Sequence, residues 1–215
     1  QRVVLPFLRA AGVTRLDTLV VSHRDKDHAG GLPAILEALP VGRFLTSASD
    51  AGGEPCVAGQ AWQWDGVRFS VLHPLGGDYP ATSKRLNGMS CVLRIEAAGR
   101  VTLLAADIEA RDEAALVARS SSSLRSDVLV VPHHGGSGSS SSAFIDAVAA
   151  AEAVFSAGYR NPFGHPRPDV LARYRQSRLW RTDRDGAIRI DLGDPMAVSA
   201  FRREHRRYWH SADGL

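Results

Sequence analysis

The stretch Leu19-Val20-Val21-Ser22-His23-Arg24-Asp25-Lys26-Asp27-His28-Ala29-Gly30-Gly31 decides the fold of this chain. Its apolar start is typical of a buried strand, and its paired glycines predict a turn into a helix. Alternate side chains of an extended chain point to the same side, so His23, Asp25 and Asp27 are expected to converge, and the turn adds His28. These four side chains can begin two adjacent metal sites.

The same residues also fit a solvated turn, because clusters of His, Asp, Lys and Arg in loops usually serve solubility. The spacing favours metal binding instead. Potential ligands recur at every second position after an apolar strand, and the glycines next to them let the backbone approach closely.

Composition indicates a globular protein of one domain. The chain has 215 residues, of which 44% are hydrophobic, so it can bury a core. No stretch approaches the roughly 20 apolar residues that span a bilayer, and no signal peptide is visible, so we expect a soluble domain. The chain begins at Gln1 rather than Met, which predicts a piece of a longer or processed protein. Cys56 and Cys91 form no C-x-x-C pair, so no zinc knuckle is expected.

Basic and aromatic residues gather at the C-terminus. The net charge is +3 and the isoelectric point is near 9.2. Residues 201–215 form a predicted tail after one domain over residues 1–200, and this tail contains Arg202, Arg203, His205, Arg206, Arg207, Tyr208 and Trp209. Cations beside aromatic rings suit a phosphate backbone with bases to stack. The alternative is a solvated, disordered tail.

Strand and helix patterns alternate along the chain, which predicts a layered α/β fold. Strands are expected at residues 16–22, 43–46, 61–73 in two pieces, 90–96, 101–105, 127–131, 153–156 and 187–192. Helices are expected at residues 33–39, 109–119, 143–151 and 168–176. The serine-rich stretches Ser120–Ser123 and Ser137–Ser142 are expected to be loops inside one domain rather than linkers.

Residues 19–32 resemble the signature of the metallo-β-lactamase fold, and specifically its variant in ComEC-type DNA-uptake proteins, where Asp replaces the second His of H-x-H-x-D-H. Asp25 is that replacement. The resemblance continues at residues 87–95, 103–110, 127–142 and 158–171. It implies a metallo-β-lactamase-like four-layer αββα sandwich. The family's D-V-G-Q-G-D and I-D-x-G motifs do not appear before His23, so we expect a truncated domain without its first strands, marginally stable or poorly active.

The resemblance adds ligands from later strand ends. Asp107 resembles the family's metal-bridging aspartate, although an Asp at this place also suits a helix N-cap. Ala106 stands where the family usually has Gly, and its methyl is expected to crowd the turn. His133 and His134 resemble the P-H-H-G-S motif, whose histidines face the metal centre. Ser137 after them is expected to donate to a phosphate.

Three further positions belong to family motifs near the pocket. His165 resembles the G-H-P element and is expected to be a late ligand or a general acid, two roles that the sequence does not separate. Asn87 and Ser90 resemble substrate-pocket residues, with a polar turn capping a strand as the alternative. His73 is expected to be structural.

The predicted chemistry is two-metal phosphodiester hydrolysis. Asp27, or a hydroxide that it orients, would serve as the base, while His134 or His165 would stabilise or protonate the leaving group. A carboxylate at Asp25 favours Mn²⁺, with Mg²⁺ or Zn²⁺ possible. Arg203, Arg206 and Arg207 are expected to contact substrate.

The resemblance also implies the biological setting. It predicts degradation of one DNA strand during natural competence, with single-stranded DNA as partner. It further predicts attachment to a membrane channel portion and a place on the extracytoplasmic face of the bacterial inner membrane. Two alternatives stay open. One is a small-molecule metallohydrolase related to phosphorylcholine esterases or β-lactamases, and the other is an inactive DNA-binding module.

Overall fold

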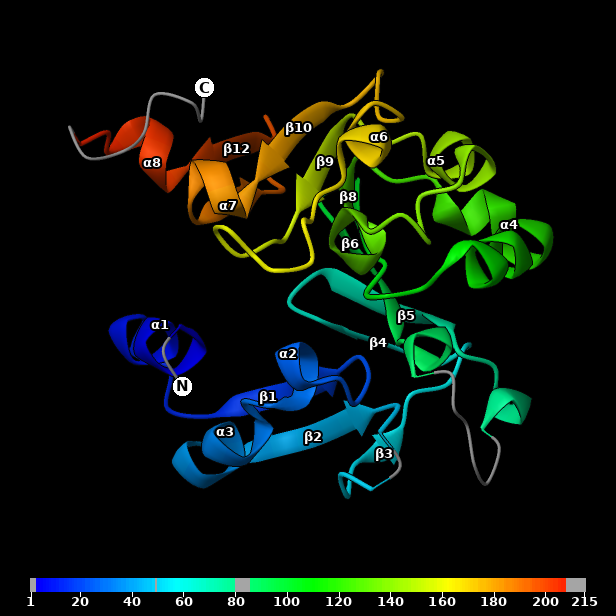
Figure 1. Ribbon diagram of the computed structural model, residues 1–215. Coiled ribbons are helices and arrows are strands. Elements are labelled where there is room, and N and C mark those ends of the chain that lie inside the picture. The colour runs from blue at the N-terminus through cyan, green and yellow to red at the C-terminus, as the bar shows by residue number, and fades with distance from the viewer. Residues whose placement is uncertain (1–2, 49, 80–85, 208–215) are drawn as a thin grey trace. The chain divides into compact units, whose positions relative to one another are not determined.

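The chain folds into two units, each built around its own sheet (Figure 1). The computed structural model describes residues 3–48, 50–79 and 86–207. The first unit comprises Gln1–Gln60 and Val71–Cys91, and the second comprises Ala61–Ser70 and Val92–Leu215. Both units mix helices and strands, so the predicted α/β class is confirmed. The four-layer packing and the division into residues 1–200 and 201–215 stay predictions.

The first unit contains a parallel sheet of three strands in the order β1-β2-β3. The strands are β1 (Leu16–Val21), β2 (Val41–Thr46) and β3 (Glu54–Pro55), and the helices are α1 (Val4–Ala10), α2 (Lys26–Ala29) and α3 (Leu32–Ala38). Parallel neighbours need a crossover connection. Helices α2 and α3 provide it between β1 and β2, so the predicted metal-binding stretch lies where β1 ends.

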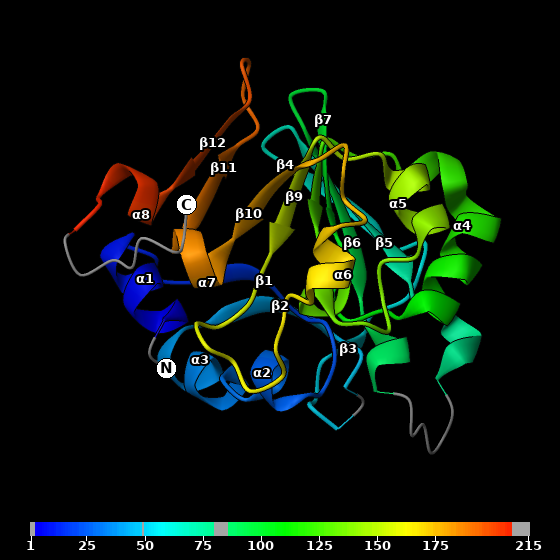
Figure 2. The ribbon, with the colours of Figure 1, turned by 45° about the horizontal axis from the view of Figure 1, so that its top comes forward.

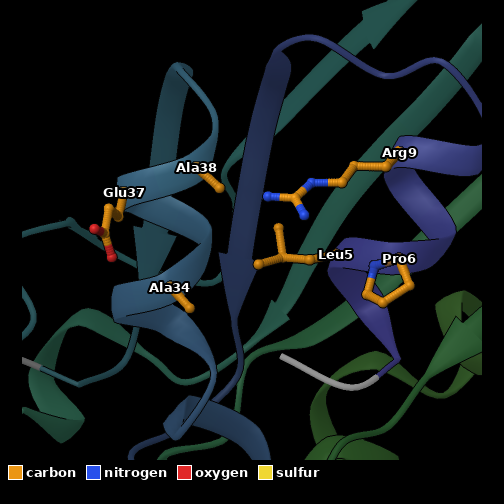
Figure 3. A pocket seen from close by; sticks show the side chains of 6 residues that line it. All are labelled: Leu5, Pro6, Arg9, Ala34, Glu37 and Ala38. Atoms are coloured by element: carbon orange, nitrogen blue, oxygen red, sulfur yellow. The ribbon is translucent and has the colours of Figure 1, made fainter.

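A hollow of about 560 Å³ lies between α1 and α3 in the first unit (Figure 3). Leu5 and the Arg9 guanidinium extend into it from α1, while Glu37 on α3 points away from Arg9. The remaining lining residues are Pro6, Ala34 and Ala38. Because this lining has no cluster of convergent carboxylates or imidazoles, the hollow does not resemble a metal site.

A disulfide between Cys56 and Cys91 closes the first unit. Both cysteines are buried, and the Cys91 N–H donates to the Ser22 carbonyl at 2.9 Å. The bridge therefore ties the loop after β3 to the segment beside the end of β1, where the potential metal ligands begin. The sequence reasoning did not predict this bond, because two cysteines 35 residues apart carry no pairing signal.

The second unit is built on a sheet of seven strands in the order β10-β9-β8-β7-β6-β5-β4. Strands β7 to β10 are mutually parallel, whereas β6 is antiparallel to β7 and β4 to β5. The strands are β4 (Ala61–Trp64), β5 (Val67–His73), β6 (Val92–Ala97), β7 (Arg100–Leu104), β8 (Val128–Val130), β9 (Glu152–Phe155) and β10 (Arg178–Arg181). The carboxyl ends of β7, β8 and β9 consequently meet at one edge.

Helices and a hairpin complete the second unit. Helices α4 and α5 lie side by side in both views (Figures 1 and 2). The elements are α4 (Ala110–Leu124), α5 (Ser142–Val148), α6 (Pro168–Leu171), α7 (Thr182–Asp185), α8 (Phe201–Glu204), β11 (Ile188–Asp191) and β12 (Ala197–Ala200). Leu103, Leu116 and Phe144 are fully buried, each contributing about 1.5–3 kcal/mol. Among the described residues, no helix has the length and apolarity to cross a membrane.

The two serine-rich stretches have different structures. Ser137–Ser142 connects β8 to α5 as expected, and it is held by buried Glu113, whose carboxylate accepts hydrogen bonds from the backbone N–H groups of Ser140 and Ser141 at 2.5 and 2.8 Å. Burial raises the pKa of this carboxyl group. The loop prediction for Ser120–Ser123 is wrong, because α4 continues to Leu124 with an irregular backbone at Ser120. Leu116 and Leu124 are both fully buried, and their burial outweighs the weak helix propensity of serine.

The carboxylate of Asp185 anchors the C-terminal elements. Arg184 and Arg203 each lie 3.1 Å from its Oδ1, and the Arg181 N–H donates to its Oδ2 at 2.9 Å. Burial alone would raise the pKa of Asp185, but these hydrogen bonds outweigh it and hold the pKa below its ordinary value. Arg203 on α8 is thereby engaged in structure. Tyr208 and Trp209 of the predicted tail lie outside the described residues.

Asp185 should make stability fall in acid. Its folded-state pKa lies below its unfolded-state value of about 3.9, so its contribution is present above that pH and is lost as the pH falls through the folded-state value. Urea unfolding of wild type and Asp185→Asn at pH 7 and pH 3 tests this. We expect the difference in unfolding free energy between the two proteins to shrink at pH 3. An unchanged difference would contradict the ion-pair account.

The disulfide should stabilise the chain through its unfolded state. Closing a 35-residue separation predicts a loss of about 3–4 kcal/mol in unfolding free energy on reduction. Urea denaturation of oxidised and reduced protein measures this, and thiol titration of the native oxidised protein is expected to find no free thiol. Two titratable thiols, or equal stability in both states, would contradict the bridge.

Candidate metal centre

The first ligand set, His23, Asp25, Asp27 and His28, comes directly after β1 in the first unit. The chain is extended only as far as Asp25, with φ −64° and ψ 148°, and α2 begins at Lys26. The prediction that an extended chain presents Asp27 is therefore wrong, because the turn starts two residues earlier. The helical turn instead brings Asp27 beside His28.

Each imidazole of the first set faces a carboxylate. The His23 Nε2 atom lies 3.6 Å from Asp25 Oδ2, and His28 Nε2 lies 3.7 Å from Asp27 Oδ2. The centroids of the two histidine rings are 4.1 Å apart. Two imidazoles and two carboxylates are thus gathered within one short segment.

Ser22 orients both rings of the first set. Its Oγ lies 3.1 Å from His23 Nδ1 and 3.0 Å from His28 Nδ1. Because both Nδ1 atoms are engaged by this hydroxyl, the Nε2 atoms are the ones directed at the carboxylates. Such a partner behind a ligand fixes its ring orientation. The sequence reasoning missed Ser22, and its only signal was a polar residue at the end of an apolar strand.

Ser90 and Asn87 lie in the same unit. The Ser90 hydroxyl is buried and lies 3.3 Å from His23 Nδ1, which places it behind a potential ligand. Asn87 opens the short 3-10 helix Asn87–Met89. His73 is buried, and its Nε2 donates to the Gly88 carbonyl at 2.9 Å, which agrees with a structural role.

The second ligand set, Asp107, His133 and His134, lies at the carboxyl edge of the second unit. Asp107 comes after β7, and the histidines come after β8 in the 3-10 turn Pro132–Gly135. His165 comes after the next parallel strand, β9. Adjacent parallel strands end at one edge, so residues distant in sequence are brought together by register alone.

His134 and Asp107 form the closest pair of the second set. The His134 Nε2 atom lies 3.5 Å from Asp107 Oδ2, and Asp107 is 4% exposed. The opposite nitrogen, His134 Nδ1, lies 2.6 Å from the Ser156 carbonyl, which can only accept, so Nδ1 carries the proton. In the neutral ring, Nε2 then presents its lone pair beside the carboxylate.

Glu109 is a further acidic neighbour that the sequence reasoning missed. Its Oε1 lies 3.6 Å from His133 Nδ1. The signal was its place two residues after Asp107, in the segment between β7 and α4. The sequence pattern there predicts the start of a helix, and Glu109 does precede the first residue of α4.

His165 lies close to both histidines of the second set. Its ring centroid is 5.8 Å from that of His133 and 6.5 Å from that of His134. Burial, and after it the charges of His133 and His134, lowers the pKa of His165. A Cβ atom on Gly136 would lie 3.1 Å from His165 Cε1, so the glycine makes room for this imidazole.

The backbone of this edge is strained at three residues. Ala106, His133 and His134 have φ values of 50°, 49° and 54°, in the left-handed region that L-residues rarely adopt. The His133 N–H donates to the Ala106 carbonyl at 2.9 Å and locks two of them together. Strain of this kind clusters at functional sites. Alanine at position 106, where the family usually has glycine, therefore lowers the stability of the chain because of its backbone angle.

The donor chemistry fits divalent cations. The carboxylate-to-imidazole distances of 3.5–3.7 Å are too long for hydrogen bonds. They are close to the separation of about 3.0–3.4 Å between two ligands that each lie about 2.1 Å from one ion. Imidazole nitrogens with carboxylate oxygens suit Zn²⁺, Mn²⁺ and related ions.

The other predicted substrate contacts, Ser137 and three arginines, lie on the second unit in different settings. Ser137 is exposed next to the His133–His134 turn. Arg203 pairs with Asp185, whereas Arg206 and Arg207 are exposed beyond α8. Substrate binding by these residues stays a prediction.

Comparison with known proteins places the chain beside competence proteins. It is 39% identical over 213 residues to competence protein ComA of Neisseria gonorrhoeae, covering 97% of this chain and 30% of that protein. It is 33% identical to recombination protein 2 of Haemophilus influenzae, covering 99% and 27%, and 33% identical to ComE operon protein 3 of Bacillus subtilis, covering 87% and 26%. The chain thus spans less than a third of the length of these relatives. No family model matches.

Solved structures show more distant likeness. A variant of CmlA β-hydroxylase aligns over 78% of this chain and 43% of its own, with a TM-score of 0.49 and 16% identity. The metallo-β-lactamase fold protein YhfI of Bacillus subtilis aligns over 69% and 68%, with a TM-score of 0.42 and 14% identity.

Relief of the strain at Ala106 should stabilise the chain. Glycine adopts a φ of 50° without the cost of about 1–2 kcal/mol that an L-residue bears, less about 0.4–1 kcal/mol of added unfolded-state entropy. Ala106→Gly is expected to raise the unfolding free energy by about 0.5–1 kcal/mol in urea titrations. The matched control is Ala105→Gly, a buried neighbour outside the left-handed region, which should lose about 1 kcal/mol. Equal losses in both variants would refute the strain account.

Proposed function

The chain is homologous to one section of the ComEC-type competence proteins, and from this premise we propose that it is a metal-dependent phosphodiesterase that degrades a DNA strand during DNA uptake. The observation that carries the proposal is the pairing of imidazole with carboxylate in both ligand sets. A binding module would not need two such sets, each with at least one imidazole held by a hydrogen bond to its Nδ1 atom.

We propose that the residues of the two ligand sets are ligands of divalent cations, of which the two-metal prediction requires a pair. The first set offers His23, Asp25, Asp27 and His28, and the second offers Asp107, His133 and His134. Buried Asp107 is the proposed bridging ligand, since a carboxylate has two oxygens to share. When bound, such ions supply Lewis-acid polarisation and an acidified water at a phosphodiester.

The protein's own residues hold and move protons around that chemistry. Asp27 is the proposed base side, and its exposed carboxylate lies at the start of α2, where solvent can reach it. His134 is fixed by the Ser156 carbonyl, so its Nε2 keeps one direction. His165, whose ring lies beside those of His133 and His134, is proposed as a late ligand or as a general acid.

Manganese is the proposed ion. Asp25 lies 3.6 Å from His23 Nε2, where an imidazole-rich site would have another histidine. A carboxylate there hardens the first set, and hard oxygen ligands shift preference from Zn²⁺ toward Mn²⁺ or Mg²⁺.

The proposed setting is the extracytoplasmic face of the bacterial inner membrane. The homology to competence proteins supports a place in DNA-uptake machinery. The Cys56–Cys91 disulfide supports an oxidising compartment, because such bonds are rare in the reducing cytosol. Single-stranded DNA is the proposed substrate, and attachment to a membrane channel portion belongs to the same proposal.

Cleavage of labelled single-stranded DNA tests the activity. We expect Mn²⁺-dependent cleavage that chelator abolishes, and a fall of at least about 100-fold for Asp27→Ala and for Asp107→Ala, one from each ligand set. Asp17→Ala is the control, since Asp17 is an exposed aspartate on β1 whose partner is Arg15.

Each alternative gives a different result. Binding of DNA in chelator without cleavage in any metal would indicate an inactive binding module. Cleavage of a small phosphodiester but not of DNA would indicate a small-molecule hydrolase. Activity restored to metal-stripped protein by Zn²⁺ and not by Mn²⁺ would refute the argument from ligand hardness. Full activity in Asp107→Ala or in Asp27→Ala would refute a catalytic role for the ligand set that contains the substituted residue.

A further inference from the structure

The loop between β9 and α6 exposes two aromatic rings beside the second ligand set. This aromatic loop, residues 158–165, is the yellow segment after β9 in Figure 2. Phe163 is 74% exposed and Tyr159 is 59% exposed. Neither ring contributes to the core, and an aromatic ring in solvent beside a candidate site is available to contact a ligand.

The aromatic loop is held in one shape by Asn161. Its Nδ2 donates to the carbonyls of Gly158 and His165 at 3.0 and 2.5 Å, and its Oδ1 accepts from the His165 N–H at 3.0 Å. Backbone hydrogen bonds from Asn161 to Gly158 and from Gly164 to Asn161 close the turn. Phe163 is therefore presented by a pre-organised scaffold, which lowers the entropy cost of binding.

Phe163 is the outermost of three neighbouring rings, the last of which belongs to a proposed metal ligand. Phe163 stacks on His165 with centroids 5.9 Å apart and planes inclined by 21°. His165 in turn lies 6.5 Å from His134 at 22°. Three nearly parallel rings thus run from solvent to the proposed ligand His134, and a planar group placed on Phe163 would continue the series.

Two arginines lie beside the Tyr159 ring. The guanidinium carbons of Arg160 and Arg202 lie 5.2 and 6.0 Å from the Tyr159 centroid. Arg202 donates to the backbone carbonyls of Asp183 and Arg184. In the part of the chain that the structure describes, no ion pair joins a carboxylate to Arg160 or Arg202, so no neighbouring carboxylate offsets their positive charges.

We propose that the aromatic loop is a stacking platform for unpaired nucleobases of a single-stranded nucleic acid, with Phe163 and Tyr159 as the stacking rings and Arg160 and Arg202 as the phosphate contacts. Stacking on flat rings tolerates any base, while the bases of a duplex are already stacked on each other. The inference deepens the proposed function, and it rests on that function only for the cleavage that comes after binding. It places this binding surface for the single strand on the second unit.

Binding without catalysis tests the platform. Fluorescence anisotropy in chelator measures the affinity of the full chain for a labelled oligothymidylate and for an abasic strand of equal length and charge. We expect wild type to bind the oligothymidylate at least about fivefold more tightly than the abasic strand, and Phe163→Ala to lose that difference. Tyr159→Ala should weaken binding in the same direction.

Control variants separate stacking from folding. Phe163→Trp keeps a flat ring and should bind the oligothymidylate as wild type does. Phe7→Ala removes a phenylalanine on α1 that is equally exposed, at 70%, and should leave binding unchanged. The thermal unfolding temperature of every variant should match that of wild type, because none of these rings is buried.

Three outcomes would overturn the platform: wild-type affinity for oligothymidylate in Phe163→Ala, equal affinity of wild type for the abasic strand, or a preference for duplex over single strand. Sedimentation with anionic vesicles that depends on Phe163, without base-dependent DNA binding, would assign the ring to a membrane surface instead. Failure of the proposed function is distinguishable, since base-dependent binding in chelator without metal-dependent cleavage would keep the platform and reject the hydrolase.

Discussion

Carboxylates held beside imidazoles are the constraint on which the rest of the structure depends. Asp25, Asp27 and Asp107 lie 3.5–3.7 Å from histidine nitrogens, too far for hydrogen bonds and near enough to share a cation. Asp107 is buried, and the proposed divalent ions would offset part of the cost of burying its charge while supplying the hydrolytic chemistry.

A few features of the fold position these carboxylates and imidazoles. Parallel strands β7, β8 and β9 end at one edge, so the residues after them gather there without any sequence proximity. Left-handed backbone at His133 and His134 turns the chain sharply after β8. Behind the rings, Ser22 and the Ser156 carbonyl fix which nitrogen faces the carboxylates. The buried apolar residues of the sheet hold this strained backbone in place.

Sequence reasoning predicted the α/β class and the segments that carry the candidate ligands, because apolar runs ending in His or Asp mark strand ends. It missed side chains without such a signal. Ser22 and Glu109 act through contacts that only the folded chain creates. The sequence also failed at Ser120–Ser123, where buried Leu124 extends α4 past weak helix formers. Strand β10 was overlooked because Arg178 and Arg181 flank Trp180, which cation–π contacts from Arg178 and Arg203 cover.

The central claim is that the imidazole–carboxylate pairs of each ligand set bind divalent cations. Anomalous diffraction at the manganese edge from crystals of this chain grown with Mn²⁺ tests it most directly. The account predicts manganese peaks beside Asp25 and Asp27 of the first set and beside Asp107 of the second set. Peaks bound by one set alone, or no peak beside Asp107, would contradict it.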